Sequence, residues 1–252
     1  MKKLRSKLKA GLIIPDQHIP YNDEVVWDLM MQVAKDIKPY FIRILGDFAD
    51  CYSVSFHSKD PRRAGNLDYE IDLVNQKLDE LDTLGAANKE YCAGNHEDRI
   101  ERYIRDRAPA IFNMMKIDGI LKLKERGWKY VPYKKSSKLG KLHFTHDVGS
   151  ATRYSVFKCL DTFAASNATG HTHRFAYVVE GTATGDVKLS CQFGWGGDVE
   201  KVDYMHRVQA MKNWANGFGI FYLDETSGIV YVVPVPVIKK TCMVGGKLYV
   251  AK

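Results

Sequence analysis

The stretch Gly94-Asn95-His96-Glu97 decides how the rest of the sequence is interpreted. It follows a strand-like run at residues 90–93 and precedes a charged segment at residues 97–107 that predicts a helix. An amide and an imidazole therefore stand side by side where a strand is expected to end. Side chains in that position can reach into a cleft, so polar residues at other strand ends are candidates for their partners.

The composition is that of a folded, soluble protein. The chain has 252 residues, enough for one large domain or two small ones with a sizeable core. Hydrophobic residues make up 45% and charged residues 27%, which excludes a disordered chain. Because no apolar run approaches the roughly 20 residues of a membrane span, and residues 1–10 lack a signal-peptide core, we expect a cytoplasmic protein with no membrane contact.

The positive charge is concentrated at one end of the sequence. The formal net charge is +7, and residues 1–10 contribute five positive charges, from Lys2, Lys3, Arg5, Lys7 and Lys9. Such a segment attracts nucleic acid non-specifically, although a solvated leader is the simpler interpretation. We predict a basic tail over residues 1–10 and a single domain over residues 11–252. The five scattered cysteines, without a C-x-x-C pair, predict reduced, buried thiols.

The first hundred residues alternate between strand and helix patterns. Strands are predicted at residues 12–14 and 40–45, before the one at 90–93. Apolar residues at helical spacing predict one helix capped by Asn22 and stopped by Pro39, and another from residue 71 to Gly85. Residues 51–68 predict a loop over the cleft. Parallel strands need crossover helices, so the rhythm predicts an α/β domain whose strands end at one edge.

The second half of the chain is richer in strand patterns. An alternating run at residues 142–145 ends at His146, a helix is predicted at 152–160, and a short strand at 166–169 leads to Gly170. Further strand segments are predicted at 176–179, 187–193, 219–223, 229–237 and 247–251. The residues thus predict two β layers with helices outside.

Polar residues at the predicted strand ends form one candidate site. They comprise two carboxylates, one amide and five of the eight histidines: Asp16, His18, Asp47, Asn95, His96, His146, His171 and His173. Carboxylate oxygen combined with imidazole nitrogen suits borderline divalent ions such as Mn, Fe, Zn, Co or Ni. The lack of cysteine ligands disfavours a closed structural zinc site.

The spacing of these residues favours two ions over one. Residues i and i+2 of an extended segment point the same way, so the Asp16/His18 and His171/His173 pairs can each present two ligands. One octahedral ion cannot use all of these groups, whereas two ions that share Asp47 can. A pair of ions roughly 3.5 to 4 Å apart stabilises the attacking and leaving oxygens of an in-line displacement, which predicts phosphoester hydrolysis. Each motif taken alone is as readily explained as a turn. The occurrence of all of them in one chain, each at a predicted strand end, favours a functional site.

The series of motifs resembles a known signature. Asp16-x-His18, Gly46-Asp47-x-x-Asp50, Gly94-Asn95-His96-Glu97, His146 and Gly170-His171-x-His173 together look like the signature of the calcineurin-like metallophosphoesterase superfamily. The motifs extend from residue 16 to residue 173, about two thirds of the chain. The resemblance implies a four-layer α/β/β/α sandwich and a dinuclear centre of two divalent ions, with Mn as the first expectation.

The resemblance also implies a role for each residue. One ion would be held by Asp16, His18, Asp47 and His173, and the other by Asp47, Asn95, His146 and His171. His96 would act on the leaving group by donating a proton or stabilising the transition state, and metal-activated hydroxide would attack phosphorus. Asp50 would orient His96 or a ligand. Glu97 is interpreted as a helix-start residue favoured by the helix dipole.

Three positions leave alternatives open. His146 is followed by Asp147 where many members of the superfamily have Gly, and His143 is the competing candidate for this ligand. We prefer His146 because it ends the strand. His57 and His206 fall outside the motifs, and of these two His57 is the candidate for substrate contact.

The substrate is less constrained than the chemistry. Cys51 and Tyr52 stand where the protein Ser/Thr phosphatase branch has Arg-Gly, which disfavours that branch. Residues 94–99, 170–174 and 214–218 are similar to compact phosphoesterases often found in bacteriophage genomes and described as DNA-repair exonuclease-like. Arginines are candidates for a phosphate track, and three aromatic residues for stacking on bases: Arg62, Arg63, Arg99, Arg102 and Arg174, with Tyr52, Phe56 and Trp195.

The resemblance therefore implies a phosphodiesterase or nuclease acting on nucleic acid or nucleotides. A phosphomonoesterase, on small molecules or on proteins, is the alternative, and a non-catalytic metal-binding scaffold is an alternative of another class. Nucleases of double-strand-break repair carry a carboxyl-terminal DNA-binding extension, for which the residues after 240 are too few. We thus expect either short substrates or a protein partner that supplies DNA binding, in the host cytoplasm if the source is a bacteriophage.

Overall fold

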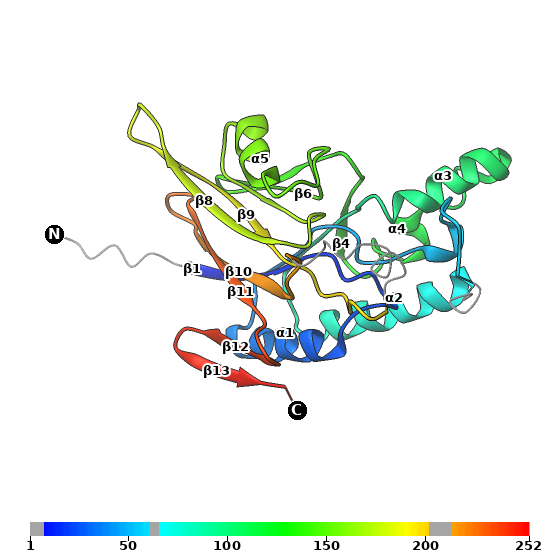
Figure 1. Cartoon of the computed structure of the whole chain (residues 1–252), viewed down its shortest axis with the longest axis horizontal. Coiled ribbons are helices and arrows are strands. Elements are labelled where there is room, and N and C mark those ends of the chain that lie inside the picture. Colours follow the sequence, from blue (N-terminus) through cyan, green and yellow to red (C-terminus); the bar gives the residue numbers. More distant parts are fainter. Residues whose placement is uncertain (1–7, 61–65, 202–212, 252) are drawn as a thin grey trace.

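Two β-sheets form the centre of the molecule (Figure 1) in the computed structural model, which describes residues 8–60, 66–201 and 213–251. The six-stranded sheet has the order β11-β10-β1-β2-β3-β4. Its strands are β1 (Leu8–Ile14), β2 (Phe41–Ile44), β3 (Asn88–Cys92), β4 (Trp128–Val131), β10 (Gly217–Asp224) and β11 (Val230–Pro236). The neighbours β1 to β4 run parallel, and β10 is antiparallel to both β1 and β11.

The second sheet has five strands in the order β5-β6-β7-β9-β8. They are β5 (Ser137–Leu139), β6 (Leu142–Thr145), β7 (Asn167–Thr169), β8 (Phe175–Gly181) and β9 (Val187–Phe193). The pairs β6-β7 and β7-β9 are parallel. A separate hairpin consists of β12 (Thr241–Val244) and β13 (Lys247–Val250).

Helices cover the outer faces of the sheets. They are α1 (Glu24–Ile37), α2 (Leu67–Asp82), α3 (Asp98–Arg107), α4 (Ile117–Ile120) and α5 (Ser155–Phe163), with the 3-10 turns η1 (Tyr52–Val54) and η3 (Pro109–Ile111). Figure 1 places α5 against the five-stranded sheet and α1 on the far side of the six-stranded one. The predicted four-layer α/β/β/α sandwich is confirmed.

Alternation along β1 explains the layers. Leu12 and Ile14 belong to the core that the six-stranded sheet shares with α1 and α2, whereas Ile13 belongs to the core between the two sheets. Successive side chains of a strand point to opposite faces, so a strand covered on both sides needs an apolar run. Phe144 and Phe193 contribute to the inter-sheet core from the second sheet.

Some boundaries differ from the sequence prediction. β1 begins at Leu8, and Leu8, Lys9 and Ala10 pair with β10, so the predicted tail over residues 1–10 is wrong for these three. These residues are held in the sheet by pairing with β10. Lys9 is also held by an ion pair, with its Nζ 2.7 Å from Glu225 Oε1. The first seven residues lie outside the described part.

Other differences concern caps and short strands. The N-cap of α1 is Asp23, whose carboxylate accepts the Val25 N–H, and not Asn22. The segment 51–68 contains the η1 turn and the start of α2, in addition to loop. Strands β4, β5 and β12 were not anticipated. All five cysteines are buried free thiols, as predicted.

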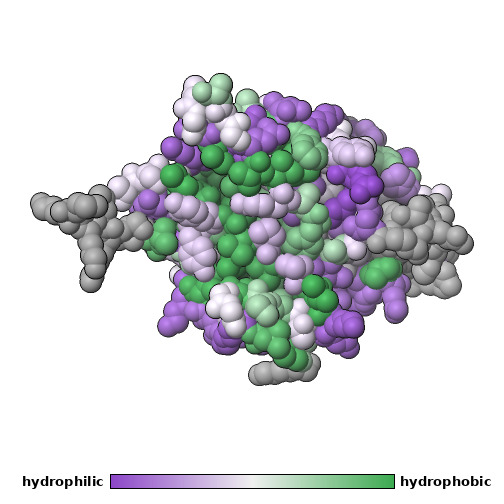
Figure 2. Space-filling model, turned by 60° about the vertical axis from the view of Figure 1, so that its left-hand side comes forward, coloured by the Kyte–Doolittle hydropathy of each residue, from purple (hydrophilic) through white to green (hydrophobic). Residues whose placement is uncertain are grey.

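Hydrophobic residues also reach the surface. Figure 2 shows a band of them on the face that carries the strands and hairpin at the left of Figure 1. Exposed apolar residues of β8, β11 and the hairpin are Tyr177, Val179, Tyr231, Val233, Met243 and Leu248. No helix within the described ranges combines the length and the apolar character needed to cross a membrane.

Candidate metal centre

The ends of five parallel strands bring the predicted site residues together. Asp16 and His18 follow β1, Asp47 follows β2, and Asn95 with His96 follows β3. In the second sheet, His146 follows β6, and His171 with His173 follows β7. Because parallel strands end at the same edge of a sheet, and the two sheets pack face to face, both sets of loops meet at one place.

Three overlapping groups of metal-ligand type occur among the described residues, and the ligand atoms of each group lie within 4.8 Å of one another. They are Asp16/His18/His173, Asp47/His146/His171 and His18/Asp47/His96. The first two match the two ligand sets that the resemblance implies, apart from Asn95 and the sharing of Asp47. Buried His/Asp clusters of this kind can hold divalent ions.

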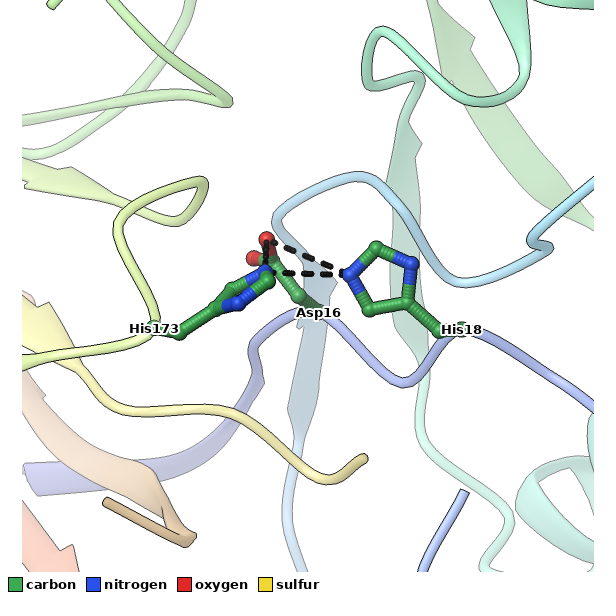
Figure 3. Close-up of side chains that lie close together, drawn as sticks. All are labelled: Asp16, His18 and His173. Carbon is green, nitrogen blue, oxygen red and sulfur yellow. Dashed lines mark hydrogen bonds and ion pairs between the residues drawn. The ribbon is translucent and has the colours of Figure 1, made fainter. Parts of the chain in front are cut away.

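The first group is shown in Figure 3, where Asp16 and His18 of the segment after β1 face His173 of the segment after β7. His173 Nε2 lies 3.1 Å from Asp16 Oδ2 and 3.0 Å from His18 Nε2. His18 Nδ1 lies 3.0 Å from Asp50 Oδ2, and donation to this carboxylate leaves Nε2 of a neutral ring as an acceptor. Acceptor atoms that converge in this way fit a cation between them.

The second group is oriented by the backbone. His146 Nδ1 lies 2.8 Å from the Leu45 carbonyl oxygen, which accepts its proton and directs Nε2 into the site. His146 Nε2 lies 3.3 Å from Asp47 Oδ2 and 3.0 Å from Asn95 Oδ1. Asn95 is therefore adjacent to this group. The His171 ring is 5.1 Å from the His146 ring, centroid to centroid.

The two groups are connected through Asp16. Its carboxylate oxygens accept the backbone N–H of His171 at 2.9 and 3.0 Å, while Oδ2 also faces His173 in the first group. Glycine is required where the loops touch, because a Cβ added to Gly46 would lie 2.5 Å from His146 Nδ1. The motif glycine thus permits the close approach of the β2 and β6 loops.

Neighbouring histidines keep both carboxylates ionised against the effect of burial. Burial raises the pKa of Asp47, but His146 and His96 outweigh it and hold the pKa well below its ordinary value. Burial likewise opposes ionisation of Asp16, and the hydrogen bond to His173 prevails, so that its pKa is lowered. The buried site therefore presents anionic oxygens and imidazole nitrogens, a donor set that fits divalent ions.

The histidines differ from one another in their electrostatic surroundings. Burial lowers the pKa of His146, but Asp47 more than compensates and raises it to about 10. Burial dominates at His173 and lowers its pKa to about 4 despite the contact with Asp16. At His18 the Asp50 carboxylate overcomes burial and raises the pKa. The carboxylates thus favour protonated His18 and His146, whose protons a bound cation would replace.

Backbone strain is concentrated in the same loops. His18, Asp47, His171 and His173 have φ angles of +52°, +46°, +71° and +57°. The left-handed region is uncommon for residues other than Gly, and such conformations cost on the order of 1–3 kcal/mol each where they persist. Strain held by four predicted ligands indicates that the loops are constrained to a functional geometry.

His96 belongs to the third group, with His18 and Asp47, and to neither of the two groups that match the implied ligand sets. Its backbone N–H donates to Asp47 Oδ1 at 2.8 Å, and its Nε2 lies 3.7 Å from Asp47 Oδ2. On the other side, Nδ1 lies 3.1 Å from the Asp50 carbonyl oxygen and 3.3 Å from Asp50 Oδ2. Arg99 Nη2 approaches His96 Nε2 to 2.9 Å. The role of His96 stays a prediction.

Asp50 connects His18 and His96 to α3. Its carboxylate contacts the Nδ1 atoms of His18 and His96, and Arg99 Nη1 donates to Asp50 Oδ1 at 3.1 Å and to its carbonyl at 2.9 Å. Burial opposes ionisation of Asp50, but His96 and His18 outweigh it and hold the pKa far below its ordinary range. This placement agrees with the orienting role implied for Asp50, and it brings Arg99 to the site.

The other substrate-contact candidates lie elsewhere. Arg174 Nη1 donates to the Ala151 carbonyl at 2.8 Å, and His57 is exposed with its backbone N–H bound to Ser55 Oγ. Among the described residues, the ligand groups do not include His57. Arg62, Arg63 and His206 lie outside the described residues.

Structural detail decides two of the open alternatives. His146 lies beside Asp47, whereas the His143 ring packs on Phe163 with the centroids 5.3 Å apart. Trp195 is only 1% exposed and stacks on the His173 ring at 4.7 Å, and Tyr52 is also buried. Their interpretation as base-stacking platforms is therefore wrong, because neither presents a free face.

Glu97 stands at the N-cap position of α3, as predicted for a helix-start residue, but its carboxylate makes no capping hydrogen bond. The residue is fully buried, and its carboxylate binds backbone N–H groups of neighbouring loops instead of stabilising the first turn of α3 from the surface. Glu70 of α2, which the sequence analysis did not single out, binds the backbone of Tyr52 and Ser53 in a similar way. An acidic residue in an apolar helix face, beside Ile71 and Val74, was the available indication for Glu70.

Comparison with known proteins finds solved structures that resemble this chain at low sequence identity. No protein-family model matches the chain, and no curated protein matches it. Similar solved structures include vacuolar protein sorting 29 from Cryptosporidium parvum, with 15% identity, a TM-score of 0.48, and coverage of 97% of this chain and 96% of the other.

Two further structures of Vps29 are similar to the chain. A double mutant from Entamoeba histolytica has 11% identity and a TM-score of 0.45, with coverage of 95% and 96% of the two chains. The protein from Chaetomium thermophilum has 12% identity and a TM-score of 0.44, with coverage of 89% and 96%. Similarity at this level assigns neither a family nor an activity to this chain.

Proposed function

We propose that this chain is a dinuclear, metal-dependent phosphoester hydrolase, and specifically a phosphodiesterase that acts on nucleic acid or nucleotides. The observation that carries the proposal is the pair of His/Asp groups on two facing sets of strand ends, with Asp47 in one and Asp16 in the other. Their match to the ligand sets implied by the metallophosphoesterase motifs supports the same reaction class.

The residues would be divided between two divalent ions, for which we propose Mn. Asp16, His18 and His173 would hold one ion, and His146, His171 and Asn95 the other, with Asp47 shared between them. When bound, such ions supply Lewis acidity and activate water as a nucleophile near neutral pH. The His171 N–H that binds the Asp16 carboxylate, and the Leu45 carbonyl that binds His146, would orient the ligand atoms beforehand.

His96 and Arg99 would act at the edge of this centre. Arg99 donates to His96 Nε2, so in the neutral ring the proton resides on Nδ1 and faces the Asp50 carbonyl. A substrate phosphate that pairs with the Arg99 guanidinium would release Nε2. The freed Nε2 could then take up a proton, and the resulting imidazolium could stabilise charge or deliver that proton at the leaving oxygen, with its ring plane fixed by Asp50.

The proposed substrate class follows from the motif resemblance and from the basic composition of the chain. A polyanionic substrate agrees with the net charge of +7, with the exposed Phe56 and with the partly exposed Arg102, whose Nη2 donates to the Asn95 carbonyl oxygen. We further propose a cytoplasmic setting and, for long DNA, a protein partner that contributes DNA binding.

A parallel assay tests the proposal. The chain is incubated with Mn and either bis(4-nitrophenyl) phosphate or 4-nitrophenyl phosphate, followed by single-stranded and duplex DNA, with Asp47→Asn as the control. We expect Mn-dependent cleavage of the diester that exceeds cleavage of the monoester and is lost in the control. Preference for the monoester would replace the proposal with a phosphomonoesterase. Mn binding without turnover of either ester would leave a metal-binding scaffold.

A further inference from the structure

The loop that carries Asp47 is shaped around one buried carboxylate, that of Glu97. Glu97 Oε2 accepts the backbone N–H of Asp47 at 3.0 Å and that of Gly94 at 2.7 Å. Glu97 Oε1 accepts the backbone N–H of Phe48 at 2.8 Å and that of Ala49 at 3.0 Å. Three consecutive N–H groups of one loop, and one from the next, thus converge on a side chain with no solvent exposure.

A fifth donor completes the coordination of this carboxylate. The Tyr91 hydroxyl, itself fully buried in β3, donates to Glu97 Oε1 at 2.8 Å. An ionised carboxylate offers about four lone-pair positions on two oxygens, so these donors saturate it. An amide in its place would present an NH₂ group to backbone N–H groups, which are donors as well.

The consequence of this arrangement falls on Asp47. Its φ angle of +46° is unfavourable for a residue with a side chain, and the N–H bonds to Glu97 hold the backbone in that conformation. The Asp47 carboxylate then points away from Glu97, with Oδ2 3.3 Å from His146 Nε2 and Oδ1 accepting the His96 N–H at 2.8 Å. Close contact fixes the two loops together, because a Cβ on Gly94 would lie 2.1 Å from Asp47 Oδ1.

We infer that Glu97 is a positioning residue of the metal centre, which fixes the Asp47 carboxylate between the two ligand groups through the backbone of its loop. The inference rests on the proposed metal centre, but it concerns metal affinity and holds whichever ester is cleaved. Loss of a group that orients a metal ligand typically lowers metal affinity by about 10- to 100-fold.

Glu70 provides a matched control in the same connection between β2 and α2. It is 2% exposed, and its carboxylate accepts the backbone N–H groups of Tyr52 and Ser53, each at 2.8 Å. Like Glu97 it is a buried carboxylate that binds backbone of this connection. The residues that it binds follow Asp50 in the sequence, and none of these hydrogen bonds involves Asp47.

The test compares Glu97→Gln with Glu70→Gln in the full chain. Mn binding to the metal-free proteins is measured by calorimetry and by metal content after gel filtration, and the thermal unfolding of the metal-free proteins is recorded alongside. We expect two bound ions in the wild type and a loss of about 10- to 100-fold in affinity for at least one ion in Glu97→Gln. Glu70→Gln should unfold at lower temperature while keeping the wild-type affinities.

The outcomes separate the inference from the proposed function. Wild-type affinities in a folded Glu97→Gln variant, or an equal loss in Glu70→Gln, would overturn the positioning role. Failure of the wild type to bind Mn at all would overturn the metal centre itself. If Glu97→Gln does not fold, the positioning role is tested with Tyr91→Phe. This variant is the milder one, because it removes only one hydrogen-bond donor to Glu97. Weaker Mn binding by that variant supports the inference, and unchanged binding contradicts it.

Discussion

His96 lies between Asp50, which contacts its Nδ1 atom, and Arg99, which contacts its Nε2 atom. Neither ring nitrogen is closer than 3.7 Å to the carboxylate of Asp47, whereas His146 Nε2 approaches the same carboxylate to 3.3 Å. The two histidines are therefore placed differently with respect to the ligand groups. This difference favours a role for His96 in proton transfer or charge stabilisation over metal binding.

Replacement of His96 by alanine tests that distinction. We expect Mn-dependent hydrolysis by His96→Ala to fall by about 10²- to 10⁴-fold, the range for loss of a positioned acid or base. Metal content should stay at two ions per chain, because the two groups that match the implied ligand sets do not contain His96 and keep their oxygen and nitrogen atoms. The control is His143→Ala, which removes a histidine of β6 whose ring packs on Phe163. Loss of an ion from His96→Ala would make His96 a ligand.

The candidate site residues could be identified from the sequence, but the burial and hydrogen-bond partners of the residues around them could not. The order of the motifs at strand ends was sufficient to single out Asp16, Asp47 and His146, because parallel strands end at one edge. Nothing local distinguishes the buried Glu97 from an exposed residue at a helix start, since its donors come from a loop about 50 residues earlier. The burial of Trp195 beneath His173 likewise depends on contacts distant in sequence.

At the scale of elements, the β12–β13 hairpin completes the layer of helices on the six-stranded sheet. Cys242, Val244 and Tyr249 belong to the same core as residues of α1. On the surface, Asp36 of α1 binds the hairpin through Lys247 Nζ and through the Tyr249 hydroxyl, the latter at 2.8 Å. The hairpin is thus attached both by apolar packing and by a hydrogen-bonded carboxylate.

The Asp36 contact should make the stability of this attachment depend on pH. The hydrogen bonds from Lys247 and Tyr249 lower the pKa of Asp36 below its ordinary value of 3.8. The stabilisation is therefore present above pH 3.8 and is lost as the pH falls through the folded-state pKa. We expect Asp36→Asn to unfold at lower urea concentration than the wild type at pH 7, and the difference to shrink as the pH falls below 3.8.

The matched control is Asp72→Asn, which removes an exposed carboxylate of α2. Urea unfolding followed by circular dichroism measures all three proteins. If Asp72→Asn showed the same loss, or if the difference for Asp36→Asn did not shrink on acidification below pH 3.8, the effect would come from net charge or from hairpin packing and not from the Asp36 contact.

Elements were predictable in proportion to their length and periodicity. The helices α1 and α2 have repeated apolar residues such as Leu29, Val33, Val74 and Leu78, and the buried strand β1 has a continuous apolar run. Strands β4 and β5 have four and three residues, too few for either period to be evident. Their conformation is set by pairing with β3 and β6, which is a tertiary effect.

For the whole molecule, the candidate metal centre lies where the two sheets meet. Ligand candidates come from β1, β2 and β3 on one side and from β6 and β7 on the other. An ion held by both sets would bind the folded state and not the unfolded chain. The stability of the entire fold should therefore depend on the metal.

Thermal unfolding measures this dependence. At a free Mn concentration 100 times the dissociation constant, one site adds about 2.7 kcal/mol to the free energy of unfolding. For a domain of this size we expect the melting temperature to rise by roughly 5 to 10 °C, and a chelator to reverse the rise. Asp47→Asn serves as the control and should respond less. An unchanged melting temperature in the wild type would exclude a metal-linked fold.

The central claim is that two ions held by these groups make the chain a phosphoester hydrolase. The most direct measurement is a titration of the metal-free protein with Mn, in which bound metal and the hydrolysis of bis(4-nitrophenyl) phosphate are recorded in the same sample. We expect binding to saturate at two ions per chain and hydrolysis to rise as the second ion binds. Saturation at two ions without hydrolysis, or at fewer than two, would contradict the claim.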